Sequence, residues 1–236
     1  MIGQLDEHAI AGQSRPEIEH ADGSRTPLWP GTWPDRPGDV SIVDRCSGAT
    51  LDVGSGPGRL TIALAERGIP ALGIDVAPVA VRLTRTSGAL ALPRDVFGRV
   101  PGTGRWMTVL LIDGSIGIGG DPVVLLRRIA ELLAPGGQAL VEIQSPGTEA
   151  YSEQVRLCHG DQASPWFQWA RVGADQIAGI ATSAGLALTE TWTASGRWFG
   201  VLRQRVPDDI PDFPGIPDSP ATLDSGDVPP APRSST

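Results

Sequence analysis

Three glycines at alternate positions, Gly54, Gly56 and Gly58, stand between an apolar segment and a helical pattern. A turn without side chains lets its backbone lie against a ligand, and the first N–H groups of the following helix favour an anionic or electron-rich group. Asp75 ends the next apolar run, where a carboxylate can bind a ribose diol in a doubly wound sheet. Together these residues predict a site for a nucleoside-containing cofactor.

The spacing of the glycines distinguishes between cofactors. A dinucleotide fingerprint has its third glycine where this chain has Arg59, whereas here the third glycine comes one residue earlier and Asp52 precedes the first by two. The pattern D-x-G-x-G-x-G resembles the first motif of class I S-adenosylmethionine-dependent methyltransferases. The resemblance implies S-adenosylmethionine as the cofactor. It assigns to this cofactor the residues Asp52, Gly54, Ser55, Gly56, Gly58, Asp75 and Val76.

Composition limits the other classes of function. The net charge of −8 argues against nucleic-acid binding, because a phosphate backbone would be repelled. All 19 basic residues are arginine, which excludes Schiff-base enzymes and P-loop nucleotidases, since both need a lysine amine. No apolar run approaches the roughly 18 residues of a membrane span, and the N-terminus lacks a signal-peptide pattern. Cys46 and Cys158 form no metal-ligand cluster, so we expect a cytoplasmic protein with no metal and no membrane partner.

Three segments differ in composition. Residues 1–40 are polar and rich in Pro and Gly, and they are interpreted as disordered or as a cap over the cofactor. Residues 41–205 carry the patterns expected of the S-adenosylmethionine-binding domain. Residues 206–236 are acidic and lack periodicity, which predicts a disordered tail.

Strand and helix patterns alternate through the central segment. Strands are predicted at 50–53, 71–74, 89–92, 107–112 and 138–143, and helices at 58–67, from Pro78, from Asp121-Pro122 and, after a long loop, at 174–184. The segments 186–193 and 197–203 predict a hairpin. The order predicts an α/β fold with a doubly wound, mostly parallel seven-stranded sheet and an antiparallel C-terminal hairpin, which is the Rossmann-like fold of the resembled methyltransferases.

The resemblance extends to later strand ends, where parallel sheets bind ligands. It implies that Asp95 accepts a hydrogen bond from the adenine amino group, that Val96 packs on the ring, and that Asp113 lies at the cofactor. Residues 106–122 are similar to a bacterial methyltransferase subfamily with the segment D-G-N-I-G-I-G-G-D-P, although Ser115 replaces its asparagine. The L-L-x-P-G-G turn of that subfamily also occurs here, at 132–137.

Catalytic residues are less well defined by the pattern. The methyl group of S-adenosylmethionine is already activated, so the protein must mainly hold donor and acceptor in line and sometimes remove a proton. Glu142, His159 and Asp113 are candidate bases. The aromatic residues of the C-terminal third are interpreted mainly as core, with Trp166 and Trp169 the best placed to reach a substrate.

The sequence therefore predicts an S-adenosylmethionine-dependent methyltransferase that acts on an unidentified small molecule. Two alternatives stay open. One is an NAD(P)-dependent oxidoreductase of Rossmann type, and the other is a module that binds S-adenosylmethionine without catalysis. The oligomeric state is not predicted.

Overall fold

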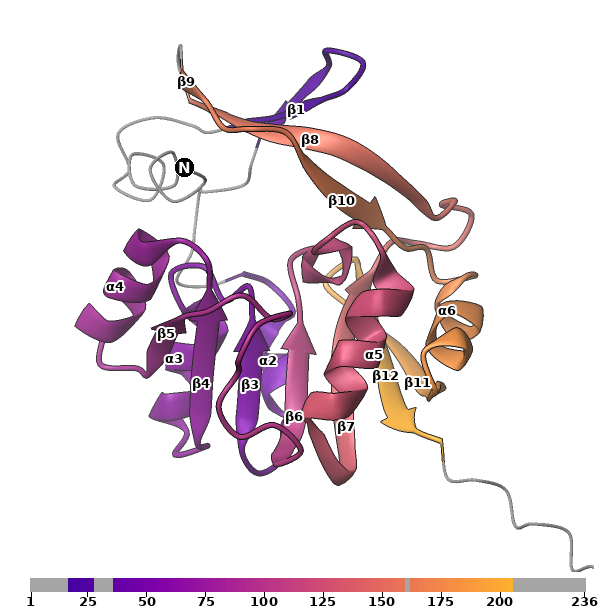
Figure 1. Ribbon diagram of the computed structural model, residues 1–236. Coiled ribbons are helices and arrows are strands. Elements are labelled where there is room, and N and C mark those ends of the chain that lie inside the picture. Colours follow the sequence, from indigo (N-terminus) through magenta and orange to yellow (C-terminus); the bar gives the residue numbers. More distant parts are fainter. Residues whose placement is uncertain (1–16, 28–35, 160–161, 206–236) are drawn as a thin grey trace, which may run out of the picture. The chain divides into compact units, whose positions relative to one another are not determined.

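A seven-stranded sheet forms the centre of the computed structural model, which describes residues 17–27, 36–159 and 162–205 (Figure 1). Its strand order is β11-β12-β7-β6-β3-β4-β5. The strands are β3 (Thr50–Val53), β4 (Ala71–Asp75), β5 (Ala91–Pro93), β6 (Trp106–Leu111), β7 (Leu133–Ile143), β11 (Leu186–Ala194) and β12 (Arg197–Gln204). The strands β3 to β7 pair in parallel, and β12 pairs antiparallel with both β7 and β11. The predicted sheet with its antiparallel hairpin is confirmed.

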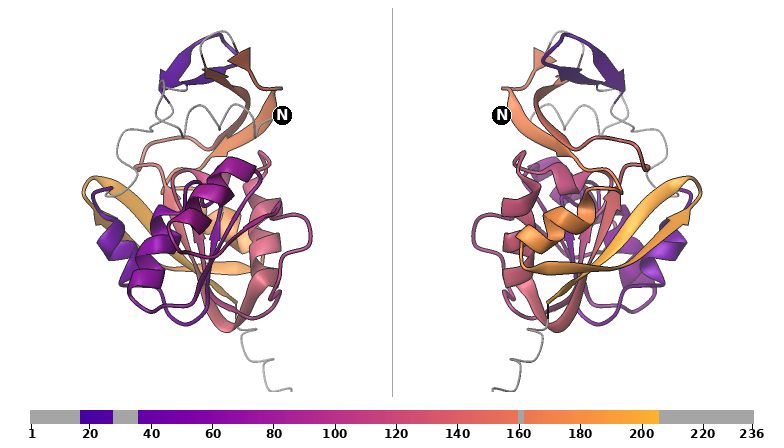
Figure 2. Two further views of the ribbon diagram at one scale, coloured as in Figure 1. Left: turned by 90° about the vertical axis from the view of Figure 1, so that its left-hand side faces the viewer. Right: turned by 90° about the vertical axis from the view of Figure 1, so that its right-hand side faces the viewer.

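Helices cover both faces of this sheet (Figure 2). Along β6, Val109 and Leu111 belong to one core cluster and Leu110 to the other, and all three are fully buried. Because successive residues of a strand point to opposite faces, the two clusters lie on opposite sides of the sheet. The first contains residues of α5 (Pro122–Leu132) and α6 (Ile177–Ser183), and the second contains residues of α2 (Asp39–Val43) and α3 (Arg59–Glu66).

The helix α5 begins as predicted. Asp121 Oδ1 accepts hydrogen bonds from the N–H groups of Val123 and Val124, both at 3.0 Å, and Pro122 occupies the first turn, where its missing N–H is not needed. Burial of a large aliphatic side chain contributes about 1.5–3 kcal/mol. The fully buried residues of α5 are Leu125, Leu126, Ile129 and Leu132.

The strand β7 is longer than predicted. Its first residue, Leu133, pairs with Trp106, and the next pairing joins Gln138 to Thr108. The residues between them form an irregularity within the strand. The Pro-Gly-Gly segment therefore does not separate α5 from the strand as a simple turn, because the chain already pairs with β6 before it.

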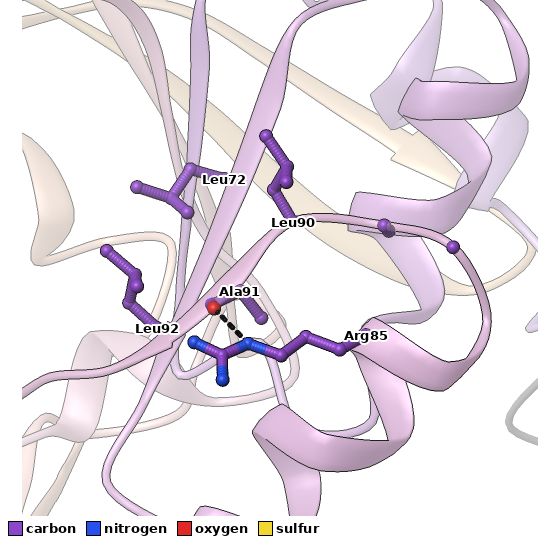
Figure 3. A pocket seen from close by; sticks show the side chains of 7 residues that line it. Leu72, Arg85, Leu90, Ala91 and Leu92 are labelled. Atoms are coloured by element: carbon purple, nitrogen blue, oxygen red, sulfur yellow. Dashed lines mark hydrogen bonds between the residues drawn. The ribbon is translucent and has the colours of Figure 1, made fainter.

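The strand β5 lies at one edge of the sheet, two residues later than predicted at its start. A groove beside it is lined by Leu72, Leu90 and Leu92, and by Arg85 of α4 (Pro78–Thr86) (Figure 3). Arg85 Nε donates to the carbonyl oxygen of Ala91 at 2.8 Å. The guanidinium thus occupies an acceptor that an added strand would need, which protects the edge from pairing with another chain.

A second sheet replaces the long loop that the sequence predicts after β7, so that prediction is wrong. Its order is β10-β8-β1-β2, with β9 paired to β8, and every pairing is antiparallel. The strands are β1 (Glu17–His20), β2 (Arg25–Pro27), β8 (Tyr151–His159), β9 (Gln162–Ala163) and β10 (Phe167–Arg171). Polar side chains on both faces hide the two-residue period that identifies a half-buried strand.

Residues 17–27 of the predicted polar segment 1–40 supply β1 and β2. The remaining residues 1–16 and 28–35, and the predicted acidic tail at 206–236, lie outside the described residues. None of the helices in the described ranges is long and apolar enough to cross a membrane.

Candidate functional site

The glycine turn joins β3 to α3 and is held by the neighbouring strand. Gly54, Gly56 and Gly58 have φ values of 67°, 54° and 85°, in the left-handed region that glycine adopts without strain. The N–H groups of Gly54 and Ser55 both donate to the carbonyl oxygen of Ile74, at 2.9 and 3.1 Å. The position of the turn is therefore set by the end of β4.

Two glycines near this turn allow close packing. A Cβ at Gly58 would overlap the side chain of Thr84 in α4, and a Cβ at Gly73 would lie 2.7 Å from Ser55 Oγ. Ser55 is buried and its hydroxyl faces the sheet. Of the predicted cofactor residues, Ser55 therefore has a side chain that is closed to a ligand.

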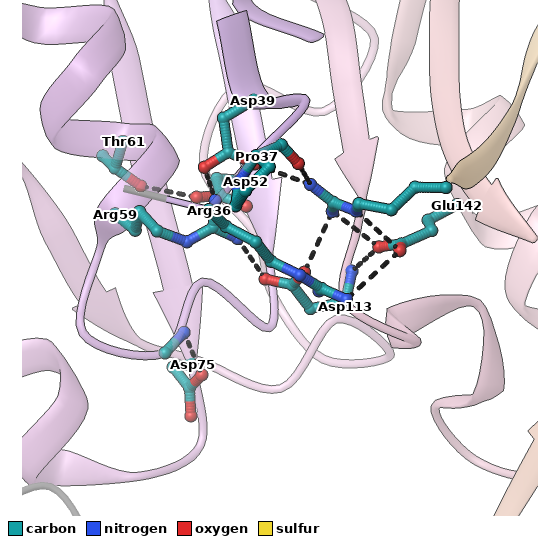
Figure 4. Close-up of polar contacts among 11 residues, drawn as sticks. Arg36, Pro37, Asp39, Asp52, Arg59, Thr61, Asp75, Asp113 and Glu142 are labelled. Carbon is teal, nitrogen blue, oxygen red and sulfur yellow. Dashed lines mark hydrogen bonds and ion pairs between the residues drawn. The ribbon is translucent and has the colours of Figure 1, made fainter. Parts of the chain in front are cut away.

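Asp75 joins the turn to the end of β4 (Figure 4). Its Oδ2 accepts from Gly56 N–H and its Oδ1 from Ala77 N–H, both at 2.8 Å. Burial raises the pKa of Asp75, and the backbone hydrogen bonds oppose that shift. Each carboxylate oxygen keeps a further lone pair, so Asp75 can hold the turn and still accept from a ribose diol. The adjacent Val76 is 56% exposed.

The N–H groups of the turn are already used within the protein. Those of Gly54, Ser55 and Gly56 bond to β4, and Gly58 N–H donates to the carbonyl oxygen of Ser55 at 3.0 Å. A pyrophosphate binds at such a turn through free N–H groups. The turn itself, residues 54–58, therefore offers a ligand no free N–H group.

Asp52 lies beneath the turn. It is 4% exposed, and its Oδ2 accepts from Thr61 Oγ1 of α3 at 2.7 Å. Burial raises the pKa of Asp52 to about 7, although the hydrogen bond from Thr61 opposes the shift. Its side chain anchors α3 on β3 from within, and direct contact with a cofactor stays a prediction.

Asp95 and Val96 follow β5. Asp95 is exposed, and its Oδ1 accepts from Phe97 N–H at 3.0 Å, which leaves the second oxygen for an outside donor. Val96 is only 3% exposed and packs in the core, whereas the next residue, Phe97, is 41% exposed. The exposed apolar side chain at this position is thus that of Phe97, which the sequence did not single out.

An ionic network lies where β6 and β7 end (Figure 4), and the sequence did not predict it. Arg59 contacts both Asp39 and Asp113. Burial lowers the pKa of Arg59, and Asp113 opposes this shift. Asp113 has a φ of +58°, a conformation that costs energy in a non-glycine residue and is often found at functional sites. The members are Arg36, Asp39, Arg59, Asp113, Glu142 and Arg197.

Glu142, a candidate base, is bound inside this network. Its oxygens accept from Nε and Nη2 of Arg197, both at 2.9 Å, and from Asp113 N–H at 2.6 Å. Each carboxylate oxygen thus accepts from Arg197, and Glu142 fixes β12 against β7. Asp113 likewise contacts Arg36, Arg59 and Arg197. The other candidate, His159, ends β8, and its side chain lies outside the description.

The aromatic residues of the C-terminal third differ in burial, and contact of Trp166 and Trp169 with a substrate stays a prediction. Trp192 and Phe199 stack with ring centroids 4.8 Å apart, and Phe199 is fully buried. Trp166 is 41% exposed, and Cζ of Arg156 lies over its ring, 4.7 Å from the ring centroid. Trp169 lies beside Gly114, since a Cβ there would be 3.9 Å from its indole. Trp169 is therefore the aromatic residue next to Asp113.

Across the described ranges, no group of three or more His, Cys, Asp or Glu residues is placed to hold a metal ion. The arginines of the ionic network were not identified from the sequence. Of these, only Arg59 lies next to a recognisable motif, because it directly follows the last glycine of the turn. Arg36 and Arg197 are far from it in the chain, so no local pattern connects them.

A family model described as a methyltransferase domain matches residues 39–191. Among curated proteins, none matches the chain. A solved S-adenosylmethionine-dependent methyltransferase from Bacteroides fragilis, in complex with S-adenosyl-L-homocysteine, is 19% identical with a TM-score of 0.72, covering 87% of this chain and 94% of that chain.

Two further structures are also similar. The CcbJ methyltransferase from Streptomyces caelestis is 17% identical with a TM-score of 0.57, covering 76% of this chain and 94% of that one. The 1,6-didemethyltoxoflavin-N1-methyltransferase from Burkholderia thailandensis, with bound 1,6-didemethyltoxoflavin and S-adenosylhomocysteine, is 17% identical with a TM-score of 0.52, covering 70% and 76%. At these identities the likeness concerns the fold.

The predicted S-adenosylmethionine-dependent methyltransferase agrees with the matched family and the observed fold, whereas an NAD(P)-dependent oxidoreductase does not. The chain belongs to the methyltransferase domain family, and its fold is that of the class I S-adenosylmethionine-dependent enzymes.

Proposed function

We propose that the protein binds S-adenosylmethionine at residues 54–58 and Asp75 and transfers its methyl group to a small molecule. The observation that carries this proposal is the double role of Asp75, which accepts from Gly56 N–H and Ala77 N–H and keeps lone pairs for a ribose. The glycine spacing and the antiparallel C-terminal hairpin argue against NAD(P). The segment 106–122 supports membership of the bacterial subfamily that it resembles.

When bound, S-adenosylmethionine supplies a methyl group that is activated by a sulfonium. In our assignment Asp75 would accept from the ribose hydroxyls, and the second oxygen of Asp95 would accept from the adenine amino group. Val76 and Phe97 offer exposed apolar surface near these carboxylates. Arg59 is the cation that follows the turn, and it would pair with the α-carboxylate of the cofactor in place of a protein carboxylate.

A small-molecule acceptor fits the charge of the chain, since the net value of −8 opposes binding to a nucleic acid. The Burkholderia thailandensis methyltransferase of similar fold was solved with bound 1,6-didemethyltoxoflavin. In-line positioning of donor and acceptor can supply roughly 7–11 kcal/mol, so no general base has to be identified for activity. We assign this function to residues 41–205 and keep a cytoplasmic location as a prediction.

Calorimetric titration with S-adenosylhomocysteine and with NAD tests the proposal on the native chain and on Asp75→Ala. Loss of hydrogen bonds to a charged group costs about 1.5–3 kcal/mol, or roughly ten- to a hundred-fold in affinity. Asp44→Ala is the matched control, because Asp44 is an exposed carboxylate that pairs with Arg67. Binding of NAD without S-adenosylhomocysteine, or full affinity in Asp75→Ala, contradicts the proposed site.

Formation of S-adenosylhomocysteine from S-adenosylmethionine over a panel of acceptors separates an enzyme from a non-catalytic module. Acceptor-dependent turnover supports the enzyme. Tight cofactor binding with no turnover across the panel favours the module instead.

A further inference from the structure

Leu72, Leu90 and Leu92 form an apolar stripe at the β5 edge of the main sheet, which we call the leucine stripe. The parallel register pairs Gly73 with Ala91, which places the residues before them side by side. Leu72 therefore lies beside Leu90, and Leu92 shares their face of the sheet because alternate residues of a strand point to the same side. Leu72 and Leu92 pack against the core cluster that contains residues of α5 and α6. Leu90 is 70% exposed, so this apolar surface continues from the core into the solvent.

The leucine stripe is one wall of the groove in Figure 3, whose volume is about 510 Å³. Gly88 lines the same groove, and no atom lies within 4 Å of a Cβ placed there, so the groove is open on that side. Sites for small molecules have volumes of roughly 300–1,000 Å³. Seven of the described residues line the groove, whereas each partner of a standard protein interface contributes roughly 20–30. The size therefore favours a small ligand over a protein.

Arg85 places a positive charge beside the leucine stripe. Its Nε donates to the carbonyl oxygen of Ala91 at 2.8 Å, which holds the guanidinium at the strand edge (Figure 3). Its two Nη nitrogens have no hydrogen bond or ion pair with any residue in the described ranges. Two such nitrogens can donate in parallel to both oxygens of one carboxylate. The charge of the groove therefore complements an anion, and the shape of the guanidinium favours a carboxylate.

The bond between Arg85 and Ala91 also limits the shape of the ligand. Gly73 N–H donates to the carbonyl oxygen of Leu90 at 2.9 Å, so the next carbonyl group, that of Ala91, points away from β4 toward the open edge. An extended peptide that adds to β5 as a strand needs this acceptor, and Arg85 already occupies it. The ligand must then be held by side chains, with an apolar part on the leucines and an anionic part on the guanidinium.

We propose that this groove binds a small amphiphilic carboxylate, with its acyl chain on the leucine stripe and its carboxylate on Nη1 and Nη2 of Arg85. The groove is separate from the proposed cofactor site. Asp75 ends β4 and Asp95 follows the end of β5, whereas Leu72 lies near the start of β4 and Leu90 directly precedes β5. The inference therefore does not depend on the proposed function.

Octanoate and octan-1-ol test the charge requirement, because they share the alkyl chain and only octanoate carries a carboxylate. Each is titrated into the full chain, and binding is followed by NMR spectroscopy. We expect octanoate to bind about three- to five-fold more tightly, a modest factor because Arg85 is exposed. Acetate, which lacks the chain, should not saturate the site at concentrations where octanoate does.

Substitutions separate the two parts of the site. Arg85→Met keeps an aliphatic stem and should remove the preference for octanoate while octan-1-ol still binds. Leu90→Ser should weaken the binding of both compounds, and it should leave the fold intact because Leu90 is exposed. Arg127→Met is the matched control and should keep the native preference. Arg127 is an exposed arginine of α5 that donates to the carbonyl oxygen of Ser183 at 3.0 Å and does not line the groove.

The native chain provides a second measurement that needs no altered site. The methyl resonances of Leu90, identified by their loss in Leu90→Ser, should shift with octanoate and not with acetate. No saturable binding of octanoate, equal affinity for octanoate and octan-1-ol, an unchanged preference in Arg85→Met, or unmoved Leu90 signals overturns the inference. Binding of S-adenosylhomocysteine to the same sample reports on the proposed function alone.

Discussion

A methyl group added at Gly58 should destabilise the protein through two separable effects. The residue has a φ of +85°, and its Cβ would overlap Oγ1 and Cγ2 of Thr84 in α4. A left-handed backbone costs a non-glycine residue about 1–2 kcal/mol, and overpacking in a tight site costs about 1–3 kcal/mol more. Gly58→Ala should therefore lower the free energy of unfolding by about 2–5 kcal/mol.

Gly68→Ala is the matched control for the backbone term. Gly68 follows the same helix with a φ of +72°, and no atom lies within 4 Å of the added Cβ. Its substitution should cost only the left-handed term, about 1–2 kcal/mol. The difference between the two variants then measures the overlap with Thr84.

Urea unfolding at equilibrium measures both values, and thermal unfolding should show about 2–4 °C per kcal/mol for a domain of this size. In the background of Thr84→Ala, Gly58→Ala should cost less, because Oγ1 and Cγ2 are gone and only Cβ of residue 84, at 2.8 Å, still overlaps. A double-mutant cycle gives this coupling. S-adenosylhomocysteine affinity should fall with Gly58→Ala, since α4 moves away from the turn. Equal destabilisation by the alanines at positions 58 and 68 would refute the packing role of Gly58.

Two further predictions concern buried charge. Burial raises the pKa of Asp52 from 3.8 to about 7. Between these two pH values the folded protein keeps a proton on Asp52 that the unfolded chain has released. The free energy of unfolding should therefore fall as the pH rises from about 4 to about 7, by at most about 4 kcal/mol. Asp52→Asn should remove that slope in urea unfolding measured across this range, and a retained slope assigns it to another group. Arg197→Met leaves buried carboxylates such as Glu142 without their main partner and should cost about 3–5 kcal/mol in thermal or urea unfolding, whereas Arg67→Met at an exposed pair should cost at most about 1 kcal/mol.

The glycine turn could be predicted from the sequence because its determinants are local. Gly54, Gly56 and Gly58 have left-handed φ values, and three glycines at alternate positions in the sequence indicate such a backbone. Asp75 is separated from them by one strand–helix–strand unit, which places the carboxyl ends of neighbouring parallel strands together. The same short range explains the accurate start of α5, where Asp121 caps the helix that Pro122 opens.

The small sheet and the ionic network could not be predicted in this way. The strand β8 pairs with β1, more than a hundred positions earlier in the chain, as His20 pairs with Val155. Neither strand shows a clean two-residue period, because Glu19 and Arg156 form a partly buried ion pair on one face while Glu153 and His20 pair on the other. In the sequence, charged residues at such positions are typical of a solvent-exposed loop, because their pairing partners are distant in the chain.

The ionic network has a consequence for cofactor binding. Arg59 is buried and already meets carboxylates from α2 and from the end of β6, Asp39 and Asp113. Burying a new charge is costly unless a partner is in place. The α-carboxylate of the cofactor would take the place of the Asp113 carboxylate beside the Arg59 guanidinium. Folding has already removed water from this guanidinium, so cofactor binding would not carry that desolvation cost. Arg197 would still hold Asp113, since it contacts it at 3.1 Å from β12. The C-terminal hairpin thus helps to determine the electrostatics at the glycine turn, although it is distant from it in the chain.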